Sequence, residues 1–422
     1  MTHKPPAYLP EQHWSYPPAY KPSSLNAEAH GASSYRGVGA VPATASQAQP
    51  IWQGEAPQKR GKQILIFSLA GLGTLIVVFF TMVEAGVSET LVGAFVALVP
   101  LAIVLAAVRW LDRWEPEPRL YLLLSFAWGA GVATASALFL NSVAFNWLDS
   151  RLDDRGLIEL IGVGLVAPLG EEVLKGGALL ALVLWRSRLF NSGVDLVVYA
   201  ATIASGFAFT ENILYFARGS GQGMLGTVFL ARAVLSPFAH IVFTTATAFI
   251  LALVLFSRRR QLLWAYPVGM ILAAGLHGLW NVTALVSGAD FPRFFLILHF
   301  PIFATTVGIA LLLRRRERRH IITHLYQYAS AGWFAEHEVK MLGALNQRRQ
   351  ARLWAKHYGV RAEQTMVEFQ RLATTLALNR HRMRYSRKKD SLERMRAKES
   401  TLLTQITRLR SVFFTLVSTA SP

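Results

Sequence analysis

Two neighbouring carboxylates and a lysine stand in a stretch that is otherwise almost entirely apolar. Residues 170–176 read GEEVLKG, between IELIGVGLVAPL and GALLALVLW. At about 100° per residue in a helix, Lys175 projects between Glu171 and Glu172, so the three side chains share one face. A charge near the centre of a bilayer costs roughly 3 kcal/mol. The three residues therefore form either a structural ion-pair network or part of a chemical site.

Further polar side chains recur in three later apolar stretches. The stretches read SGFAFTENILYF, ARAVLSPFAHIVF and AGLHGLWN, and they hold Glu211 with Asn212, Arg232 with His240, and His277 with Asn281. His277 and Asn281 are four residues apart, so they stack on one stripe of a helix. We expect the four stretches to converge on one polar cavity that opens toward the outside of the cell.

Two imidazoles and a pair of carboxylates can activate water in two ways. A glutamate can act as general base while His and Asn stabilise the oxyanion. Alternatively, Glu171, His240 and His277 bind a divalent metal such as zinc, with the second glutamate as base. The residues alone make no cofactor certain and leave this choice open. The candidate catalytic residues are Glu171, Glu172, Lys175, Glu211, Asn212, His240, His277 and Asn281.

Other catalytic designs are excluded by residue type and spacing. The 422-residue chain has no cysteine, which removes thiolate chemistry and disulfides. The HExxH, GxGD and GxSG motifs, each typical of a known class of intramembrane protease, do not occur.

The composition indicates a protein that crosses a membrane several times. Hydrophobic residues make up 53% of the chain and charged residues 16%. Apolar runs of spanning length predict an all-α bundle of about eight transmembrane helices. The third, fourth and sixth runs are overlong, which predicts tilt or a break. The runs are 64–83, 90–109, 120–146, 157–185, 194–216, 224–256, 262–287 and 294–313.

Basic residues alternate from loop to loop. They precede the first run and follow the second, fourth, sixth and eighth, whereas the other loops hold more acidic residues. The alternation predicts a multi-pass protein of the cell membrane with both termini in the cytoplasm. It also accounts for part of the net charge of +18.

Two tails flank the predicted membrane domain, 61–319. Residues 1–60 are rich in Pro and Tyr and contain PPAY twice, which predicts a disordered cytoplasmic tail. Residues 320–422 have helical spacing and an excess of Lys and Arg over Asp and Glu. We expect this basic helical tail to lie on the anionic inner leaflet of the bilayer. No base-reading motif is visible, so nucleic acid is not the expected partner.

Four motifs in order resemble the PrsW-type intramembrane proteases, which are related to the CAAX prenyl endopeptidases and bacterial self-immunity proteases. They are Asp112-Arg113-x-Glu115-Pro116-Glu117-Pro118, Glu171-Glu172-x-x-Lys175, Gly206-Phe207-Ala208-x-x-Glu211-Asn212, and His240 with His277-x-x-Trp280-Asn281.

The resemblance implies cleavage of a single-span, membrane-tethered substrate near its extracytoplasmic side, for example an anti-sigma factor in regulated proteolysis. It also implies that Glu171 and Glu172 activate water, that His240 and His277 assist, and that Asn281 is an oxyanion donor. Glu211 stands where the CAAX relatives carry a histidine, so the catalytic type stays open.

Two other functions fit a buried polar cavity. Paired carboxylates with Lys and His also form the proton relays of coupled transporters, although no inverted repeat is evident. A non-catalytic scaffold could instead bind a partner's transmembrane helix through the cavity. The hydrolase hypothesis fails if Glu171 faces lipid or lies far from both His240 and His277.

Overall fold

The structure, a computed structural model, describes residues 61–386 and 389–420. The predicted disordered tail 1–60 and its PPAY motifs lie outside the described residues. Within them every regular element is helical and none is a strand. The predicted all-α polytopic fold is therefore confirmed.

Seven helical segments are long and apolar enough to cross a membrane. The fourth predicted span, 157–185, lies in the segment Arg155–Trp185, which is helical throughout but carries Glu171, Glu172 and Lys175, so it is less apolar than these seven. The chain is a multi-pass membrane protein. The seven segments are Gln63–Ala85, Val87–Leu111, Arg119–Asp149, Gly193–Gly221, Leu225–Leu253, Arg259–Ser287 and Phe291–Ser330.

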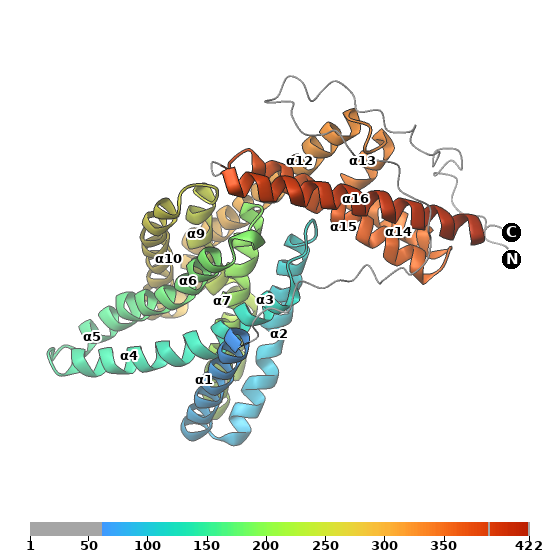
Figure 1. Ribbon diagram of the computed structural model, residues 1–422. Coiled ribbons are helices and arrows are strands. Elements are labelled where there is room, and N and C mark those ends of the chain that lie inside the picture. Colours follow the sequence, from blue (N-terminus) through green and yellow to red (C-terminus); the bar gives the residue numbers. More distant parts are fainter. Residues whose placement is uncertain (1–60, 387–388, 421–422) are drawn as a thin grey trace, which may run out of the picture. The chain divides into compact units, whose positions relative to one another are not determined.

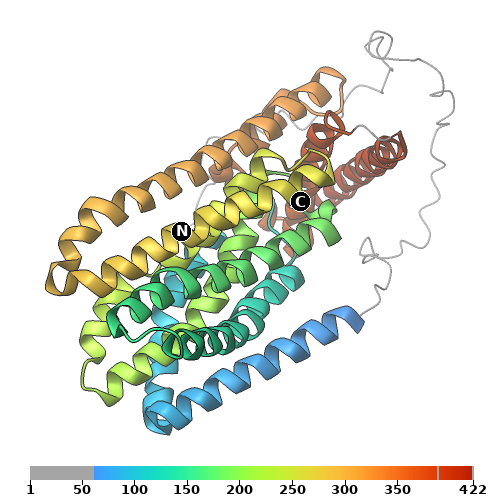
Figure 2. The same ribbon diagram turned by 90° about the vertical axis from the view of Figure 1, so that its left-hand side faces the viewer.

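Helix α7 (Gly193–Gly221) is the core of the membrane unit (Figures 1 and 2). It packs against α1 (Gly61–Ala85), α2 (Val87–Leu111), α3 (Arg119–Ala127) and α9 (Ala239–Leu253). In an apolar 18-residue stretch of α7, 89% of the residues are buried. In the corresponding stretch of the span Phe291–Ser330, which ends with α12 (Phe300–Ser330), 6% are buried. Because α7 is enclosed on all sides, polar residues on it face other helices rather than lipid.

The overlong spans are irregular, and the sixth contains a break of the kind predicted. The third contains the π-helical segment η2 (Trp128–Ala133) before α4 (Thr134–Asp149). The fourth consists of α5 (Arg155–Ile161), η3 (Gly162–Val166) and α6 (Ala167–Trp185). The sixth passes from α8 (Leu225–Phe229) through η5 (Leu230–Leu235) to α9, with residues 236–238 outside any helix. Such π-helical turns are frequent at functional sites.

Glycines allow α7 to approach its neighbours backbone to backbone. A Cβ on Gly129 of η2 would lie 2.0 Å from the carbonyl oxygen of Ile203 on α7. A Cβ on Gly206 of α7 would lie 2.1 Å from the carbonyl oxygen of Phe126 on α3. Since no side chain fits at these distances, the two glycines set how closely η2 and α3 pack against α7.

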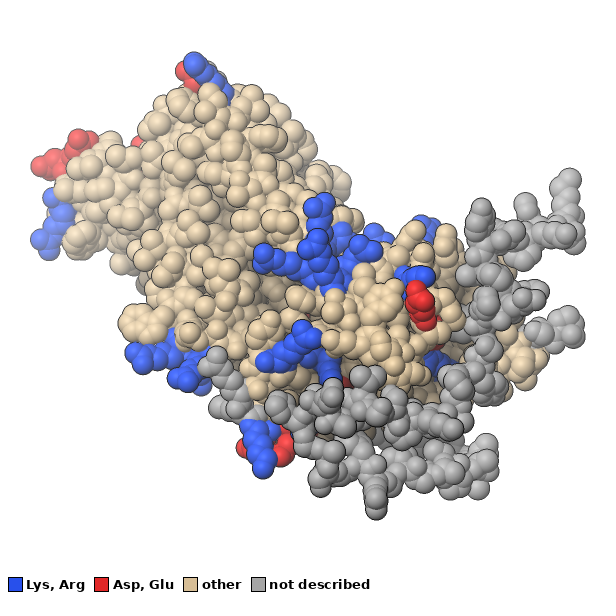
Figure 3. Space-filling view, turned by 90° about the horizontal axis from the view of Figure 1, so that it is seen from above, with Lys and Arg blue, Asp and Glu red and all other residues tan. Residues whose placement is uncertain are grey.

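The periphery of the membrane unit is apolar. Phe79, Phe95, Leu253 and Trp264 are among its large exposed side chains, with exposures of 69%, 75%, 78% and 69%. Figure 3 shows a broad area without charged side chains. A surface of this kind is expected where a protein faces lipid.

The chain divides into two compact units. One runs to Arg319 and takes in Arg382–Leu392, and it contains α10 (Arg259–Ser287), α11 (Phe291–Phe294) and η7 (Phe295–His299). The other comprises His320–His381 and the residues from Glu393 onward. Its helices include α13 (Glu336–Leu342), α14 (Leu345–Lys356), most of α15 (Val360–Met383) and most of α16 (Lys389–Ala420).

The second unit has its own core and its own buried polar contacts. Leu325, Leu342 and Leu376 are fully buried in it. The guanidinium of Arg410 forms an ion pair with Glu338 at 2.5 Å and donates to the Trp333 carbonyl at 2.6 Å. These contacts tie α16 to α13 within the unit.

Candidate active site

Helix α6 buries the charged triplet that the sequence singles out. Glu171 is 6% exposed, and Glu172 and Lys175 are 0% exposed. The Lys175 Nζ atom lies 2.7 Å from Glu172 Oε1 and 3.3 Å from Glu171 Oε2. The spacing therefore places the ammonium between the two carboxylates, as predicted, and each charge has a partner.

His277 on α10 faces both carboxylates. Its Nδ1 atom lies 3.1 Å from Glu172 Oε1, and its Nε2 atom lies 3.8 Å from Glu171 Oε2. The ring of Phe243 stacks on the imidazole with centroids 4.6 Å apart. A Cβ on Gly278 would lie 2.2 Å from the Gly164 carbonyl oxygen, so this glycine lets α10 come close enough for His277 to reach α6.

Glu172 has both carboxylate oxygens engaged. Oε1 contacts Lys175 and His277, and Oε2 accepts a hydrogen bond of 2.9 Å from Thr244 Oγ1 on α9. The sequence analysis did not select Thr244. It stands four residues after His240, and this spacing on one helical face was the available signal.

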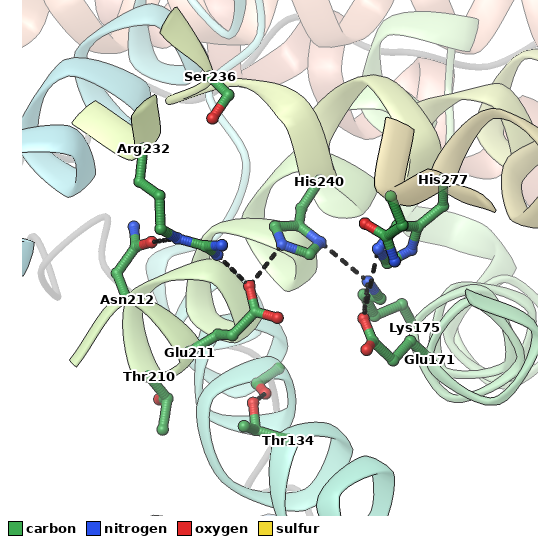
Figure 4. A network of polar contacts seen from close by, with 12 residues as sticks. Thr134, Glu171, Lys175, Thr210, Glu211, Asn212, Arg232, Ser236, His240 and His277 are labelled. Atoms are coloured by element: carbon green, nitrogen blue, oxygen red, sulfur yellow. Dashed lines mark hydrogen bonds and ion pairs between the residues drawn. The ribbon is translucent and has the colours of Figure 1, made fainter. Parts of the chain in front are cut away.

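His240 links the triplet to α7. Its Nδ1 atom lies 3.3 Å from Lys175 Nζ, and its Nε2 atom lies 2.7 Å from Glu211 Oε2. An ammonium can only donate, so Nδ1 accepts from Lys175 and the hydrogen on Nε2 is donated to Glu211. The imidazole therefore bridges the Lys175 ammonium and the Glu211 carboxylate (Figure 4).

Arg232 closes the network at its other end (Figure 4). Its guanidinium forms an ion pair with Glu211 and donates from Nε to Asn212 Oδ1 at 2.6 Å. It also lies over the ring of Tyr215, 3.9 Å from the centroid. The sequence analysis noted Arg232 in the apolar stretch of His240 but left it out of the candidate catalytic set.

Asn281 lies on the same helix as His277, but its side chain forms its hydrogen bond outside the network of Glu171 and Glu172. Its Nδ2 atom donates to the Val163 carbonyl at 3.0 Å, in the π-helical segment η3. Among the described contacts none joins Asn281 to Glu171 or Glu172. The structure thus brings together six of the eight candidates through direct contacts, Asn212 joins them through Arg232, and Asn281 donates to a backbone carbonyl instead.

The acidic residues of the DRWEPEP motif form a different cluster. Glu117 donates its backbone N–H to Asp112 Oδ2 at 3.0 Å and accepts a bond of 2.7 Å from the Tyr199 hydroxyl. Tyr199 precedes Glu211 on α7 by 12 residues, or about 18 Å of helix. Burial raises the pKa of Asp112 to about 7 and raises that of Glu117 well above its usual range. The loop thus braces the bundle through Tyr199, away from the Glu211 end of α7.

Three residues of the site have the types and positions to hold a metal ion. Glu171, His240 and His277 each offer one donor atom, and these atoms lie within 4.8 Å of one another in a buried setting. Two imidazoles and a carboxylate form one of the ligand sets of catalytic zinc. The hydrogen bond from His240 Nε2 to Glu211 is the outer contact that orients a ligating imidazole. The donor set therefore fits a divalent cation.

Comparison with known proteins agrees with this geometry. Residues 117–307 match the family described as PrsW family intramembrane metalloprotease. This part of the chain is similar to the PrsW family of intramembrane proteases. The matched PrsW region includes the whole network from Glu171 to Asn281.

Two curated PrsW proteins are similar to this chain. Protease PrsW of Clostridioides difficile (strain 630) is 28% identical over 196 residues, which cover 45% of this chain and 78% of that protein. Protease PrsW of Geobacillus kaustophilus (strain HTA426) is 27% identical over 181 residues, 40% of this chain and 69% of that protein. No solved structure gives a significant match.

Proposed function

We propose that this PrsW-like protease cleaves a peptide bond of a single-span, membrane-tethered protein near the extracytoplasmic side. The observation that carries the proposal is the contact of Glu171 with Lys175 and its position 3.8 Å from His277, inside a bundle whose outer surface is apolar. A hydrolytic site so enclosed acts on a bond that enters the membrane region.

Glu171 is the better candidate for general base of the two glutamates. Glu172 accepts from Lys175, His277 and Thr244 and is fully buried, so it orients these groups. Glu171 has fewer contacts and is 6% exposed. In this proposal Glu171 takes a proton from water as the water oxygen attacks the carbonyl carbon, and it returns the proton to the leaving nitrogen when the C–N bond breaks.

The surrounding groups support this step. The Lys175 ammonium can stabilise negative charge on the substrate carbonyl oxygen. His277 donates its Nδ1 hydrogen to Glu172 and directs Nε2 toward Glu171, so it assists by orienting the carboxylate pair. Asn281 is the further oxyanion donor that the resemblance suggests, and its present bond to Val163 would have to be exchanged for one to substrate. Glu211 and Asn212 position His240 and Arg232.

A divalent metal, with zinc as the proposed ion, would be held by Glu171, His240 and His277. When bound, it would supply Lewis-acid activation of water and carbonyl. In that case Glu172 is the carboxylate left to act as base, so the two catalytic types assign the base to different glutamates.

The substrate class and the membrane orientation rest on the sequence. The alternation of basic loops supports a cytoplasmic location of both termini. With that orientation Glu211 and His277 lie on the external half of their helices. An anti-sigma factor is the proposed kind of substrate, since the family resemblance implies it.

We also propose three functional parts: a tail 1–60, a protease domain 61–319 and a basic module 320–422 at the anionic inner leaflet. Between residues 320 and 410 there are eighteen Lys and Arg against seven Asp and Glu. Vesicle experiments with the full chain test this, since replacing phosphatidylserine by phosphatidylcholine should expose the module to added protease. Equal cleavage in both lipids would contradict it.

The central experiment uses purified protein in liposomes with a single-span substrate. Wild-type protein should release a fragment, and Glu171→Gln and His277→Ala should each abolish release while inserting normally. Cleavage by both variants at the wild-type rate would reject the assignment of the site.

A further inference from the structure

The Lys175 ammonium contacts the donor set that could hold a metal. Nζ is 3.3 Å from Glu171 Oε2 and 3.3 Å from His240 Nδ1, two of the three potential ligands. It also lies 2.7 Å from Glu172 Oε1 and 4.0 Å from the centroid of the Phe207 ring. The side chain is fully buried.

Both nitrogens of His240 are in use. Nδ1 has one lone pair in the ring plane, and the contact with Lys175 directs an N–H at it. Nε2 carries the hydrogen that is donated to Glu211. A metal can therefore bind Nδ1 only after Lys175 withdraws, because one lone pair cannot accept an N–H and coordinate a metal together.

Distance and charge lead to the same conclusion. Zinc bonds to nitrogen and oxygen are about 2.0–2.2 Å long. A metal within this reach of both Glu171 and His240 would stand next to the ammonium, and two cations in contact in a buried site repel strongly. The two cations exclude one another at these two ligands.

We propose that Lys175 is the built-in cation of the site and competes with a divalent metal for Glu171 and His240. The inference rests on the proposed function only in taking Glu171, His240 and His277 as the metal ligands. Lys175 withdraws toward Glu172 and Phe207 when metal binds. Glu172 then also serves as the counter-ion of Lys175, because its 2.7 Å ion pair neutralises the ammonium both with and without bound metal.

Substitution of the lysine tests the competition directly. Lys175→Met keeps the length of the side chain and removes the charge. We expect its affinity for Zn²⁺ to rise at least about tenfold, because metal entry no longer breaks buried ion pairs. Titration of the purified protein against a chelating dye measures this without any substrate. The control is Lys340→Met, which removes an exposed lysine paired only with Glu336 and should bind Zn²⁺ like wild type.

A folded Lys175→Met protein with wild-type affinity for Zn²⁺, or with no affinity, would overturn the proposal. Because the variant leaves two buried carboxylates without their cation, it can also fail to fold. A structure of the wild-type protein soaked with Zn²⁺ then decides. In that structure we expect Lys175 Nζ to have moved away from His240 Nδ1. The competition is refuted if zinc is bound to Glu171 and His240 while Nζ stays at hydrogen-bond distance from both residues.

These readouts are separate from proteolysis. If the wild-type protein cleaves its substrate in excess chelator and neither protein binds Zn²⁺, the competition is refuted while the protease assignment stands. If metal binding behaves as expected and no substrate is cleaved, the proposed function fails and the competition stands.

Discussion

His277 Nδ1 lies 3.1 Å from Glu172 Oε1, a contact that joins α10 to α6 at the carboxylate pair. The contact uses the nitrogen that does not face Glu171, so it fixes the ring with Nε2 directed toward Glu171. Glu172 thus determines the orientation of the His277 ring in the site.

The two glutamates should therefore respond differently to amide substitution in a metal-free mechanism. Glu171→Gln removes the proposed base and should lower kcat by about 10²–10⁴-fold. Glu172→Gln keeps an acceptor for Thr244 and should retain more activity. Cleavage of a reconstituted single-span substrate with and without chelator measures both, and the reverse order of effects would instead favour the metal-dependent assignment.

Arg232 is expected to act as a positioning residue through Glu211 and His240. Arg232→Met should leave KM near the wild-type value and lower kcat by roughly tenfold, because Glu211 loses its buried counter-charge. Arg232→Lys should restore part of the loss. The matched control is Arg218→Met, which breaks the exposed ion pair with Glu84 and should not affect kcat. Equal losses in the two Met variants would contradict the role of Arg232.

Much of the site could be predicted because it depends on spacing within a helix. Glu171, Glu172 and Lys175 share a face whatever the surrounding fold. Which atom of one helix meets which atom of another could not be predicted. The contact of Lys175 with His240 depends on how far each helix is rotated about its axis, and the residue pattern leaves that rotation open in helices that are apolar on every side.

Asn281 shows where such reasoning fails. Its spacing from His277 predicts a shared stripe, and both side chains do point toward the span that contains η3 and α6. The π-helical segment η3 presents the Val163 carbonyl, and Asn281 donates to it. A π-helical turn arises from tertiary packing and has no reliable signature in one sequence. In contrast, length and apolarity alone account for seven of the eight predicted spans.

The close approach of α10 to η3 should be sensitive to a single methyl group. A Cβ at Gly278 would meet the Gly164 carbonyl oxygen at 2.2 Å, whereas a Cβ at Gly275 would meet nothing within 4 Å. Gly278→Ala should therefore move His277 away from Glu172, lowering both activity and Tm. Gly275→Ala on the same helix should have neither effect and should raise stability by a few tenths of a kcal/mol, up to about 1 kcal/mol. Thermal unfolding in detergent and the cleavage assay measure the two properties, and a Tm for Gly278→Ala equal to that of Gly275→Ala would contradict the packing argument.

The loop between α2 and α3 should make stability depend on pH. Burial raises the pKa of Asp112 to about 7, above its ordinary value of 3.8, so the folded protein holds a proton that the unfolded chain releases. The contribution of the protonated Asp112 carboxyl group to stability is therefore present at low pH, and it is lost as the pH rises toward and through 7. Asp112→Asn keeps an acceptor for the Glu117 N–H and cannot ionise, so the fall in Tm between pH 5 and pH 8 should be smaller in this variant by roughly 3 °C or more. Asp153→Asn, which changes an exposed loop carboxylate, should keep the wild-type slope. If the Asp112 variant also keeps that slope, the carboxyl group is ionised throughout, and the loop must be held by its contacts with Tyr199 and Asn191 instead.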